Sequence, residues 1–287
     1  MSSLKGFLLA AVLFVYGCES GPDNDTELPG TPGTRLKMIV GTEETAGAFP
    51  AWSYHFSYDD QNRLIKIGYK GGLADNITDY IAYQYEGSNT QPSTSTGLVE
   101  WSNHAENHYH FFTYNSLGQL VKDSQYINNY PYPNVTRSFS YSYTTPNNFY
   151  YDCTTIYNTT RTSFELVKDA RGNITREKIT LYPTTYLLTE LEYDNKPNPL
   201  FNSLPKLYPQ YLPEESPLEL LGEILSTQKN NVTKMVKAYY NNGTVSGIPD
   251  EQVFEFLYNQ NGLPAAILHK NASLGRIDIK YVFYYEN

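Results

Sequence analysis

Hydrophobic and polar residues alternate in short runs from about Arg35 onward, and polar turn residues separate the runs. The run YHFSY at 54–58, for example, is followed by the turn DDQN at 59–62 and by the run LIKI at 64–67. Strict alternation is typical of strands that bury one face, and Asp, Asn and Gly between the runs are typical of tight turns. The pattern therefore predicts an all-β body built from antiparallel hairpins.

The same plan of strand, turn and strand returns along the chain, with clear examples at 109–123, 164–174 and 254–263. The residues that end the first strand of successive units are Tyr58, Tyr85, Tyr114, Tyr143, Lys168 and Tyr193, with steps of 27, 29, 29, 25 and 25 residues. Steps of this size fit a degenerate array of hairpins. We expect a meander that forms a large sheet, an open sandwich or a barrel-like structure.

Many runs carry Tyr-x-Tyr, as in FSYSY at 139–143. A period of two places both rings on one face of a strand and the intervening Ser or Thr on the other. Such a ring-bearing face can pack as a core or form an exposed platform, and the pattern leaves both possibilities open.

The pattern breaks between Asn195 and Asn231, where several prolines preclude continuous central strands. The segment SPLE at 216–219 has a serine N-cap, proline at the first helical position and glutamate two positions later, and apolar residues follow it. We therefore expect one short helix near 216–226. Strands resume at 232–240 and close the chain at 277–285.

Composition supports the β assignment and limits the partners. The chain has 28 tyrosines in 287 residues and a formal net charge of −9. Nucleic acids require clustered Lys and Arg, which the sequence lacks, so we expect no nucleic-acid partner. The phosphate-loop, nucleophile-elbow, HExxH and CxxC motifs are also missing, and we expect no cofactor.

The N-terminus carries a targeting signal. Residues 1–17 contain Lys5 and a ten-residue apolar run, which is too short to cross a bilayer and is typical of a signal peptide. The sequence VYGC at 15–18 resembles a bacterial lipobox, which implies cleavage before Cys18 and acylation of that residue. Residues 18–35 form an acidic tether rich in Pro and Gly, and 36–287 form a single β-rich domain.

The acids that follow Cys18 resemble the surface-export signal of Bacteroidota lipoproteins. This resemblance implies an outer-membrane protein anchored through its N-terminal lipid, with the cell surface favoured slightly over the periplasmic face.

A family resemblance rests on the segments 193–199, 229–234 and 258–264. The Tyr-Asp-turn-Gly-Leu units resemble YD or Rhs-type repeats, and the three segments resemble a Bacteroidota lipoprotein family with a porin-like, strand-rich domain. The resemblance implies a β-meander on a lipid anchor and supplies no catalytic residue. A barrel embedded in the membrane is disfavoured, because many strands alternate aromatic residues with Ser, Thr or charged residues instead of presenting an aliphatic face.

Two groups of residues could carry chemistry. Glu106, His108 and His110 would share one face of a strand, and imidazole with carboxylate suits zinc or another transition metal. The alternative is a solvated turn and strand start rich in His and Asn. The neighbouring acids Asp59-Asp60 and Glu214-Glu215 could serve glycoside hydrolysis if they paired in space, but acids on a turn are normally solvated.

Together these features favour a non-catalytic, lipid-anchored envelope protein that binds a glycan or another envelope ligand through an aromatic β surface. Candidate platform residues are Trp52, Trp101 and Tyr109, because large rings near polar turns suit sugars. The alternative is a structural or assembly subunit of an outer-membrane complex that recruits its partner by β-edge pairing. The third possibility is a glycan hydrolase.

Overall fold

The computed structural model describes residues 35–43, 51–71, 78–101, 104–130, 135–199, 201, 228–272 and 276–286. The leader, nearly all of the tether and the expected helix near 216–226 lie outside the described residues. The rest of this account concerns the described part of the chain, in which every regular element is a β-strand.

The first nine strands are β1 (Leu36–Glu43), β2 (Trp52–Tyr58), β3 (Leu64–Lys70), β4 (Asp79–Tyr85), β5 (Pro92–Trp101), β6 (His104–Tyr114), β7 (Leu120–Tyr130), β8 (Val135–Thr145) and β9 (Asn148–Thr154). The remaining strands are β10 (Thr159–Lys168), β11 (Ile174–Tyr182), β12 (Thr185–Pro197), β13 (Asn230–Asn241), β14 (Thr244–Val245), β15 (Asp250–Tyr258), β16 (Pro264–Asn271) and β17 (Arg276–Tyr285).

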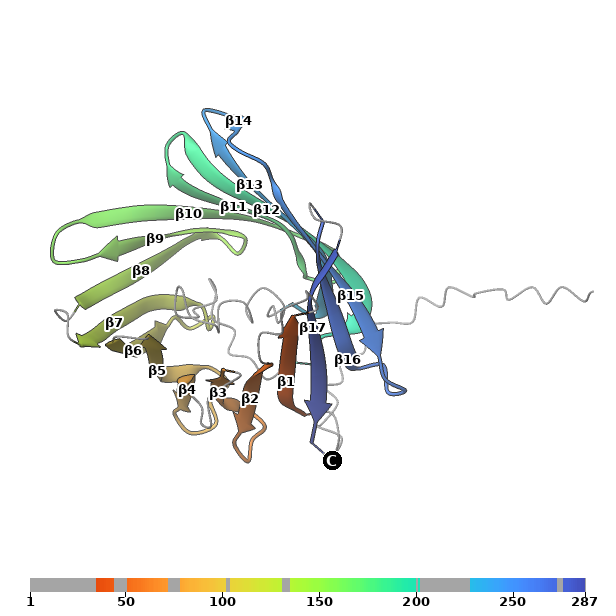
Figure 1. Ribbon diagram of the computed structural model, residues 1–287. Helices are drawn as coiled ribbons and strands as arrows, with labels where there is room; N and C mark the ends of the chain where they lie inside the picture. The colour runs from red at the N-terminus through yellow and green to blue at the C-terminus, as the bar shows by residue number, and fades with distance from the viewer. Residues whose placement is uncertain are drawn as a thin grey trace, which may run out of the picture.

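These strands form a closed antiparallel barrel. Each long strand pairs with the next one along the chain, and β17 returns to pair with β1, with Tyr281 opposite Gly41 and Phe283 opposite Ile39. The two-residue β14 is a side branch of β13, so the closed ring contains sixteen strands (Figure 1). The predicted all-β hairpin meander is confirmed, and of the three expected closures the barrel is the one that forms.

The inward face of the barrel wall is apolar and largely aromatic. On β2, for instance, Tyr54 and Phe56 are buried while Ser57 between Phe56 and Tyr58 is exposed. The inward residues pack across neighbouring strands, as in the stacked rings of Phe149 and Phe164, whose centroids lie 4.6 Å apart. The Tyr-x-Tyr rings therefore belong mainly to the core and do not form an exposed platform.

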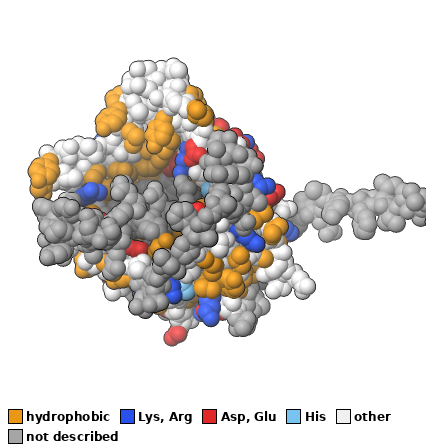
Figure 2. Space-filling model, viewed as in Figure 1, with side chains coloured by type: hydrophobic (Ala, Val, Ile, Leu, Met, Phe, Trp, Pro, Cys, Tyr) orange, Lys and Arg blue, Asp and Glu red, His pale blue; other side chains and the backbone are white. Residues whose placement is uncertain are grey.

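The outward face mixes charged and polar side chains with exposed apolar ones, such as Phe111, Tyr239 and Leu257. Four ion pairs among the described residues join neighbouring strands there: Lys178–Glu165 at 2.9 Å, Lys234–Glu251 at 2.8 Å, Arg161–Asp152 at 2.7 Å and Lys270–Glu255 at 2.5 Å. The outward positions of β8 are mostly Ser and Thr, between the inward rings of Phe139, Tyr141 and Tyr143. Figure 2 shows cationic and anionic side chains scattered over the face it displays.

One end of the barrel carries the turns predicted from the Tyr-Asx-x-x-Gly pattern. Asp59 begins the β2–β3 turn, and its carboxylate accepts hydrogen bonds from the backbone N–H groups of Gln61 and Arg63 at 3.0 and 2.9 Å. Three further turns repeat this bonding from an Asx residue: those that begin at Asn115, Asp169 and Asn259. Each turn ends with a positive φ, supplied by glycine in three cases and by Asn62 in the fourth.

The tyrosine before each turn closes the hairpin from inside. Its hydroxyl donates a hydrogen bond to the backbone carbonyl of the first residue in the preceding strand. The pairs are Tyr58 to Leu36, Tyr85 to Leu64, Tyr114 to Pro92, Tyr143 to Leu120, Tyr193 to Ile174 and Tyr285 to Pro264, at 2.6 to 2.9 Å. We call this end of the barrel the tyrosine rim. Burial raises the pKa of each of these tyrosines, so the hydroxyls stay protonated donors.

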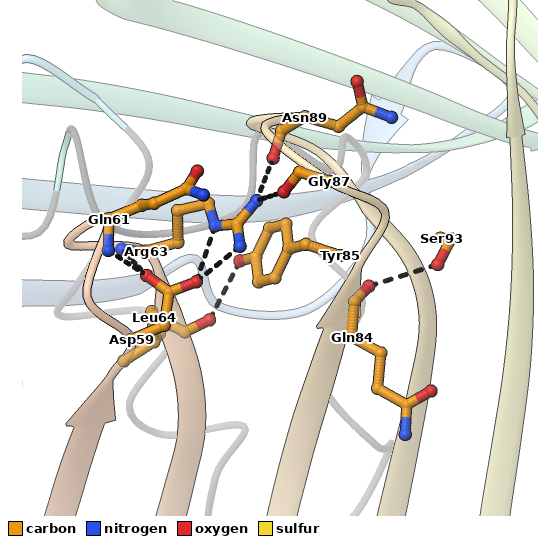
Figure 3. Close-up of polar contacts among 9 residues, drawn as sticks. All are labelled: Asp59, Gln61, Arg63, Leu64, Gln84, Tyr85, Gly87, Asn89 and Ser93. Atoms are coloured by element: carbon orange, nitrogen blue, oxygen red, sulfur yellow. Dashed lines mark hydrogen bonds and ion pairs between the residues drawn. The ribbon is translucent and has the colours of Figure 1, made fainter.

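Side chains also join adjacent turns along the tyrosine rim (Figure 3). The guanidinium of Arg63 lies 4.5 Å from the centroid of the Tyr85 ring and donates hydrogen bonds to the carbonyls of Gly87 and Asn89 in the next turn. Asp59 holds the same guanidinium from the other side at 2.6 Å. The tyrosine, the arginine and the turn carbonyls thus form one connected layer.

Removing one tyrosine hydroxyl tests this layer. We expect Tyr114→Phe to lower the free energy of unfolding by about 1 kcal/mol, because the Pro92 carbonyl loses its donor while the ring stays in place. Urea denaturation measures the change. Tyr182→Phe is the control, since Tyr182 is 69% exposed at the opposite end of the barrel, and it should leave the midpoint unchanged. Equal stability of wild type and Tyr114→Phe would contradict the role given to the hydroxyl.

Candidate functional site

A pocket of about 400 Å³ opens at the tyrosine rim, between the β6–β7, β8–β9 and β10–β11 turns. Its described lining consists of Gln91, Leu117, Gly118, Gln119, Leu120, Tyr143, Pro146, Phe149, Leu166, Lys168, Gly172, Ile174 and Gln228. The pocket coincides with the point where the repeated architecture of the rim departs from its pattern in two ways.

The first departure is a substitution within the repeat. Lys168 ends β10 at the position where the neighbouring hairpins carry Tyr143 and Tyr193. It follows the inward Leu166 and the outward Val167, and a register shift between Val167 and Lys168 matches the shifts before the tyrosines of other hairpins. A flexible amine therefore occupies the position of a rigid ring, and it caps no strand-opening carbonyl.

The second departure is a shortened turn. The β8–β9 connection has only Pro146 and Asn147 between its strands, whereas the β6–β7 and β10–β11 turns span 115–119 and 169–173. The Asn147 carbonyl accepts a backbone hydrogen bond from Leu166 at 2.9 Å, so the short turn is drawn against β10. The two longer turns extend beyond it on either side and leave the hollow.

The pocket combines an apolar floor with polar edges. Leu120, Phe149, Leu166 and Ile174 are buried and supply apolar surface. The Tyr143 hydroxyl, which donates to the Leu120 carbonyl at 2.9 Å, keeps lone pairs that can accept a further hydrogen bond. An apolar surface bordered by hydroxyl and amide groups is the usual arrangement of a small-molecule site.

Three glutamine side chains border the pocket, and hydrogen bonds to the protein fix each of them. Gln91 donates to the Gly118 carbonyl, Gln119 accepts from the Asn115 side chain at 2.9 Å, and Gln228 accepts from the backbone N–H of Ile174 at 2.8 Å. Each amide is held by one end in the described structure, so its orientation is set before any ligand arrives.

A buried asparagine network supports the same side of the pocket. Asn173 and Asn230 exchange hydrogen bonds at 2.9 and 3.2 Å, and Asn198 donates to the Gln228 carbonyl at 3.0 Å. Asp194 accepts hydrogen bonds from Tyr258 and Asn231 in the adjoining cluster. These bonds position the chain ends on both sides of 202–227 and hold Gln228 against the pocket.

The expected metal ligands do share a face. Strand β6 directs Glu106, His108 and His110 inward, and the His108 Nε2 lies 3.1 Å from the Glu106 carboxylate. His110 turns instead to Asp123 on β7, with its Nδ1 3.0 Å from the nearer carboxylate oxygen. Within the described ranges, no three His, Cys, Asp or Glu side chains are grouped so that they could hold a metal ion.

A buried polar row beside these histidines was not anticipated from the sequence. Ser95, His110 and Gln125 lie opposite one another on β5, β6 and β7, and all three are 1 to 2% exposed. Within the described part of the chain, the Ser95 Oγ and the Gln125 Oε1 have no hydrogen-bond partner, and neither does the Nδ1 of His108. Alternation predicted only that His110 shares a face with Glu106 and His108; cross-strand register, which brings Ser95 and Gln125 beside it, is not readable from one sequence.

The three expected platform residues are not brought to one surface. The Trp52 indole packs inward over Gly41, where an added Cβ would lie 2.5 Å from the ring, and meets Tyr281 edge-on at 6.4 Å. Tyr109 faces outward, is 36% exposed, and lies beside Tyr126 with ring centroids 6.1 Å apart. The side chain of Trp101 lies outside the described structure.

The acid pairs do not form a catalytic pair in the described structure. The Asp59 carboxylate is engaged by its own turn and by Arg63, while Asp60 is exposed on that turn. Glu214 and Glu215 lie outside the described residues.

Cys153 packs against the core from β9, as expected for a cysteine that behaves as a small hydrophobic residue.

The fold and the pocket define a closed antiparallel β-barrel with an aromatic interior and a pocket at one rim. No protein-family description matches the sequence, and no curated protein is similar to it. Among solved structures, the chain is similar to a porin-like protein from Bacteroides uniformis ATCC 8492, with 12% identity and a TM-score of 0.44. That similarity covers 89% of this chain and 99% of the other. The fold described above rests on the strand pairings themselves.

No helix in the described part of the chain is long and apolar enough to cross a membrane.

The buried histidines give the barrel a testable pH dependence. Burial lowers the pKa of His108, and this effect outweighs the hydrogen bond that the ring donates to the Glu106 carboxylate, which raises the pKa. A histidine with a lowered folded-state pKa takes up a proton more readily in the unfolded chain, so its contribution to stability is complete above pH about 6.5 and declines as the pH falls below that value.

We therefore expect wild type to lose more stability between pH 7.5 and 5 than His108→Gln does. Urea midpoints for both proteins at both pH values measure the difference. His110→Gln is not a suitable control, because His110 contacts the buried Asp123. Parallel pH dependence of wild type and His108→Gln would show that His108 titrates alike in the folded and unfolded chains.

Proposed function

We propose that this protein is a non-catalytic binding protein of the bacterial envelope, that it is anchored to the outer membrane through a lipid on Cys18, and that its rim pocket binds a glycan. The observation that carries the proposal is the pocket itself. Prearranged glutamine amides and the Tyr143 hydroxyl can bond to sugar hydroxyls, and the apolar floor can pack against the C–H face of a sugar ring.

The placement of the binding site differs from the aromatic surface expected from the sequence. Most rings of the Tyr-x-Tyr pattern are in the core, so they do not supply an exposed platform in the described wall. The exposed rings of Tyr109 and Tyr126, with Phe111 beside Tyr109 on β6, offer apolar contact on the outer wall. The rim pocket offers both apolar contact and oriented hydrogen-bonding groups.

Anchoring by lipid, with the barrel wall in water, fits the ion pairs on the wall. The outward ion pairs Lys178–Glu165 and Lys234–Glu251 would lose their hydration in hydrocarbon, where a charged side chain on the lipid face of a barrel costs about 2–4 kcal/mol at the midplane. A wall with these charges also explains why a separate lipid anchor would be useful to this protein. The proposed location is therefore the membrane surface, outside the hydrocarbon.

The described strand pairings give little support to the alternative of an assembly subunit that recruits its partner by β-edge pairing. Recruitment of a partner by β-edge pairing needs a strand with an unpaired edge. Each of the sixteen long strands described here has a neighbour on both sides, because β17 pairs with β1. A glycan hydrolase would need paired carboxylates at the bound sugar, and the described lining of the pocket includes no Asp or Glu.

Cleavage of the tether tests the location. A protease recognition sequence is substituted for residues 24–30, and membranes from cells that make this variant are treated with the protease. We expect the barrel to move to the soluble fraction without detergent, because only the lipid holds it. The uncut variant and a Cys18→Ala variant that incorporates no labelled palmitate are the controls. A cleaved barrel that stays in the membrane would show that the wall itself is embedded.

A pair of matched truncations tests the binding site. Leu117 lines the pocket and is 81% exposed, while Ile156 is 79% exposed on a turn at the opposite end of the barrel. We expect Leu117→Ala to weaken binding of an envelope glycan by about threefold to tenfold, because it removes exposed apolar contact surface without touching the core. Ile156→Ala should bind like wild type. Calorimetric titration compares the glycan affinities of wild type and the two variants. Equal affinities would exclude the rim pocket as the glycan-binding site.

A further inference from the structure

We infer that the rim pocket selects sugars that carry an anionic group, a carboxylate or a phosphate, and that Lys168 provides the selectivity. This inference rests on the proposed function, because it specifies the class of glycan that the pocket takes. The reasoning starts from charge. The whole chain has a formal net charge of −9, yet among the described lining residues Lys168 is the only charged one.

The Lys168 ammonium is not neutralised by its neighbours. It takes part in no ion pair or hydrogen bond within the described structure, whereas Lys178, Lys234 and Lys270 are each paired with a glutamate. The adjacent Asp169 is committed to its own turn, where it accepts hydrogen bonds from Arg171 and Asn173.

The pKa of Asp169 agrees with a carboxylate that is held by its own turn. Burial alone would raise the pKa of Asp169, but the hydrogen bonds from Asn173 and Arg171 outweigh it and lower the pKa. The aspartate is therefore already satisfied as an anion, and the lysine remains available to a ligand.

The position of Lys168 places it at the edge of the pocket. It is exposed, lines the pocket and ends β10 at the position where other hairpins carry an inward tyrosine. On either side, Tyr143 and Tyr193 bond to strand-opening carbonyls. The lysine, with no such bond, borders the hollow that the short β8–β9 turn creates.

The other polar edges suit the rest of such a ligand. The Gln91, Gln119 and Gln228 amides offer donors and acceptors without charge, which is appropriate for hydroxyl groups. A sugar with one anionic substituent would thus place its ring over the apolar floor, its hydroxyls at the amides and its anionic group at Lys168. A neutral sugar would leave the ammonium without a partner.

The experiment uses the full-length lipidated protein purified in mild detergent. Binding is measured by calorimetric titration against matched pairs of oligosaccharides in which one hexose is replaced by its uronic acid or by its phosphate ester. Wild type is compared with Lys168→Gln. Lys122→Gln is the matched control, because it makes the same charge change at an exposed outward position away from the pocket.

We expect wild type to bind the acidic member of a pair about fivefold more tightly than the neutral member at low salt, which is the size of one partly exposed ion pair. The preference should vanish in Lys168→Gln and persist in Lys122→Gln. It should shrink at 0.5 M salt, where the Debye length is about 4 Å and the attraction between exposed charges is strongly screened. The carboxylate and phosphate arms show which anion is preferred.

Two outcomes overturn the inference, and they are distinguishable. If acidic and neutral sugars bind equally well to wild type and to Lys168→Gln, the proposed glycan binding stands and the selectivity is wrong. If no sugar of either kind binds to wild type, the proposed function fails together with the inference. Circular dichroism and urea midpoints equal to those of wild type would confirm that Lys168→Gln is folded.

Discussion

The rim of this barrel depends on one hydrogen bond, which the tyrosine at the end of a strand donates to the backbone carbonyl of the first residue in the preceding strand. A strand that emerges from a turn has a carbonyl that needs a donor, and the rigid tyrosine ring reaches it from inside while burying apolar surface. Repetition of this contact around the rim explains the spacing of the tyrosines that make it. It also makes the rim sensitive to any hairpin in which the tyrosine is missing.

Alternation in the sequence was sufficient to predict the strands, the shared face of their rings and the Asx turns, because all of these are local properties; which way the ring-bearing face points was left open. The positions Tyr58, Tyr85, Tyr114, Tyr143 and Tyr193, together with Lys168, were recognisable as equivalent from their spacing alone. Closure could not be predicted in the same way. Whether a meander stays open or forms a ring depends on the pairing of β1 with β17, which lie at opposite ends of the domain and carry no complementary signal visible in a single sequence.

The candidate site shows the same division between local and distant information. The lysine in a tyrosine position and the short turn at Pro146 are both visible in the sequence, but nothing local indicates that they border one hollow. The expected platform failed to form a single surface for a related reason: a period of two specifies that Trp52 and Tyr109 each lie on one face of a strand, and only packing determines that Trp52 faces the core while Tyr109 faces outward. The inward histidines were predicted as a shared face, whereas their partner Asp123 comes from the next strand.

The central claim is that the missing tyrosine creates an anion-selective pocket at Lys168 in a barrel whose wall faces water. Nuclear magnetic resonance of protein whose lysines carry ¹³C-labelled methyl groups tests it most directly, because each lysine gives its own signal. When a uronic-acid oligosaccharide is added, the account predicts a shift of the Lys168 signal that saturates with ligand concentration, while the outward lysines Lys178 and Lys234 stay unchanged. A Lys168 signal that does not move while binding is saturated, or a shift confined to lysines of the outer wall, would contradict the account.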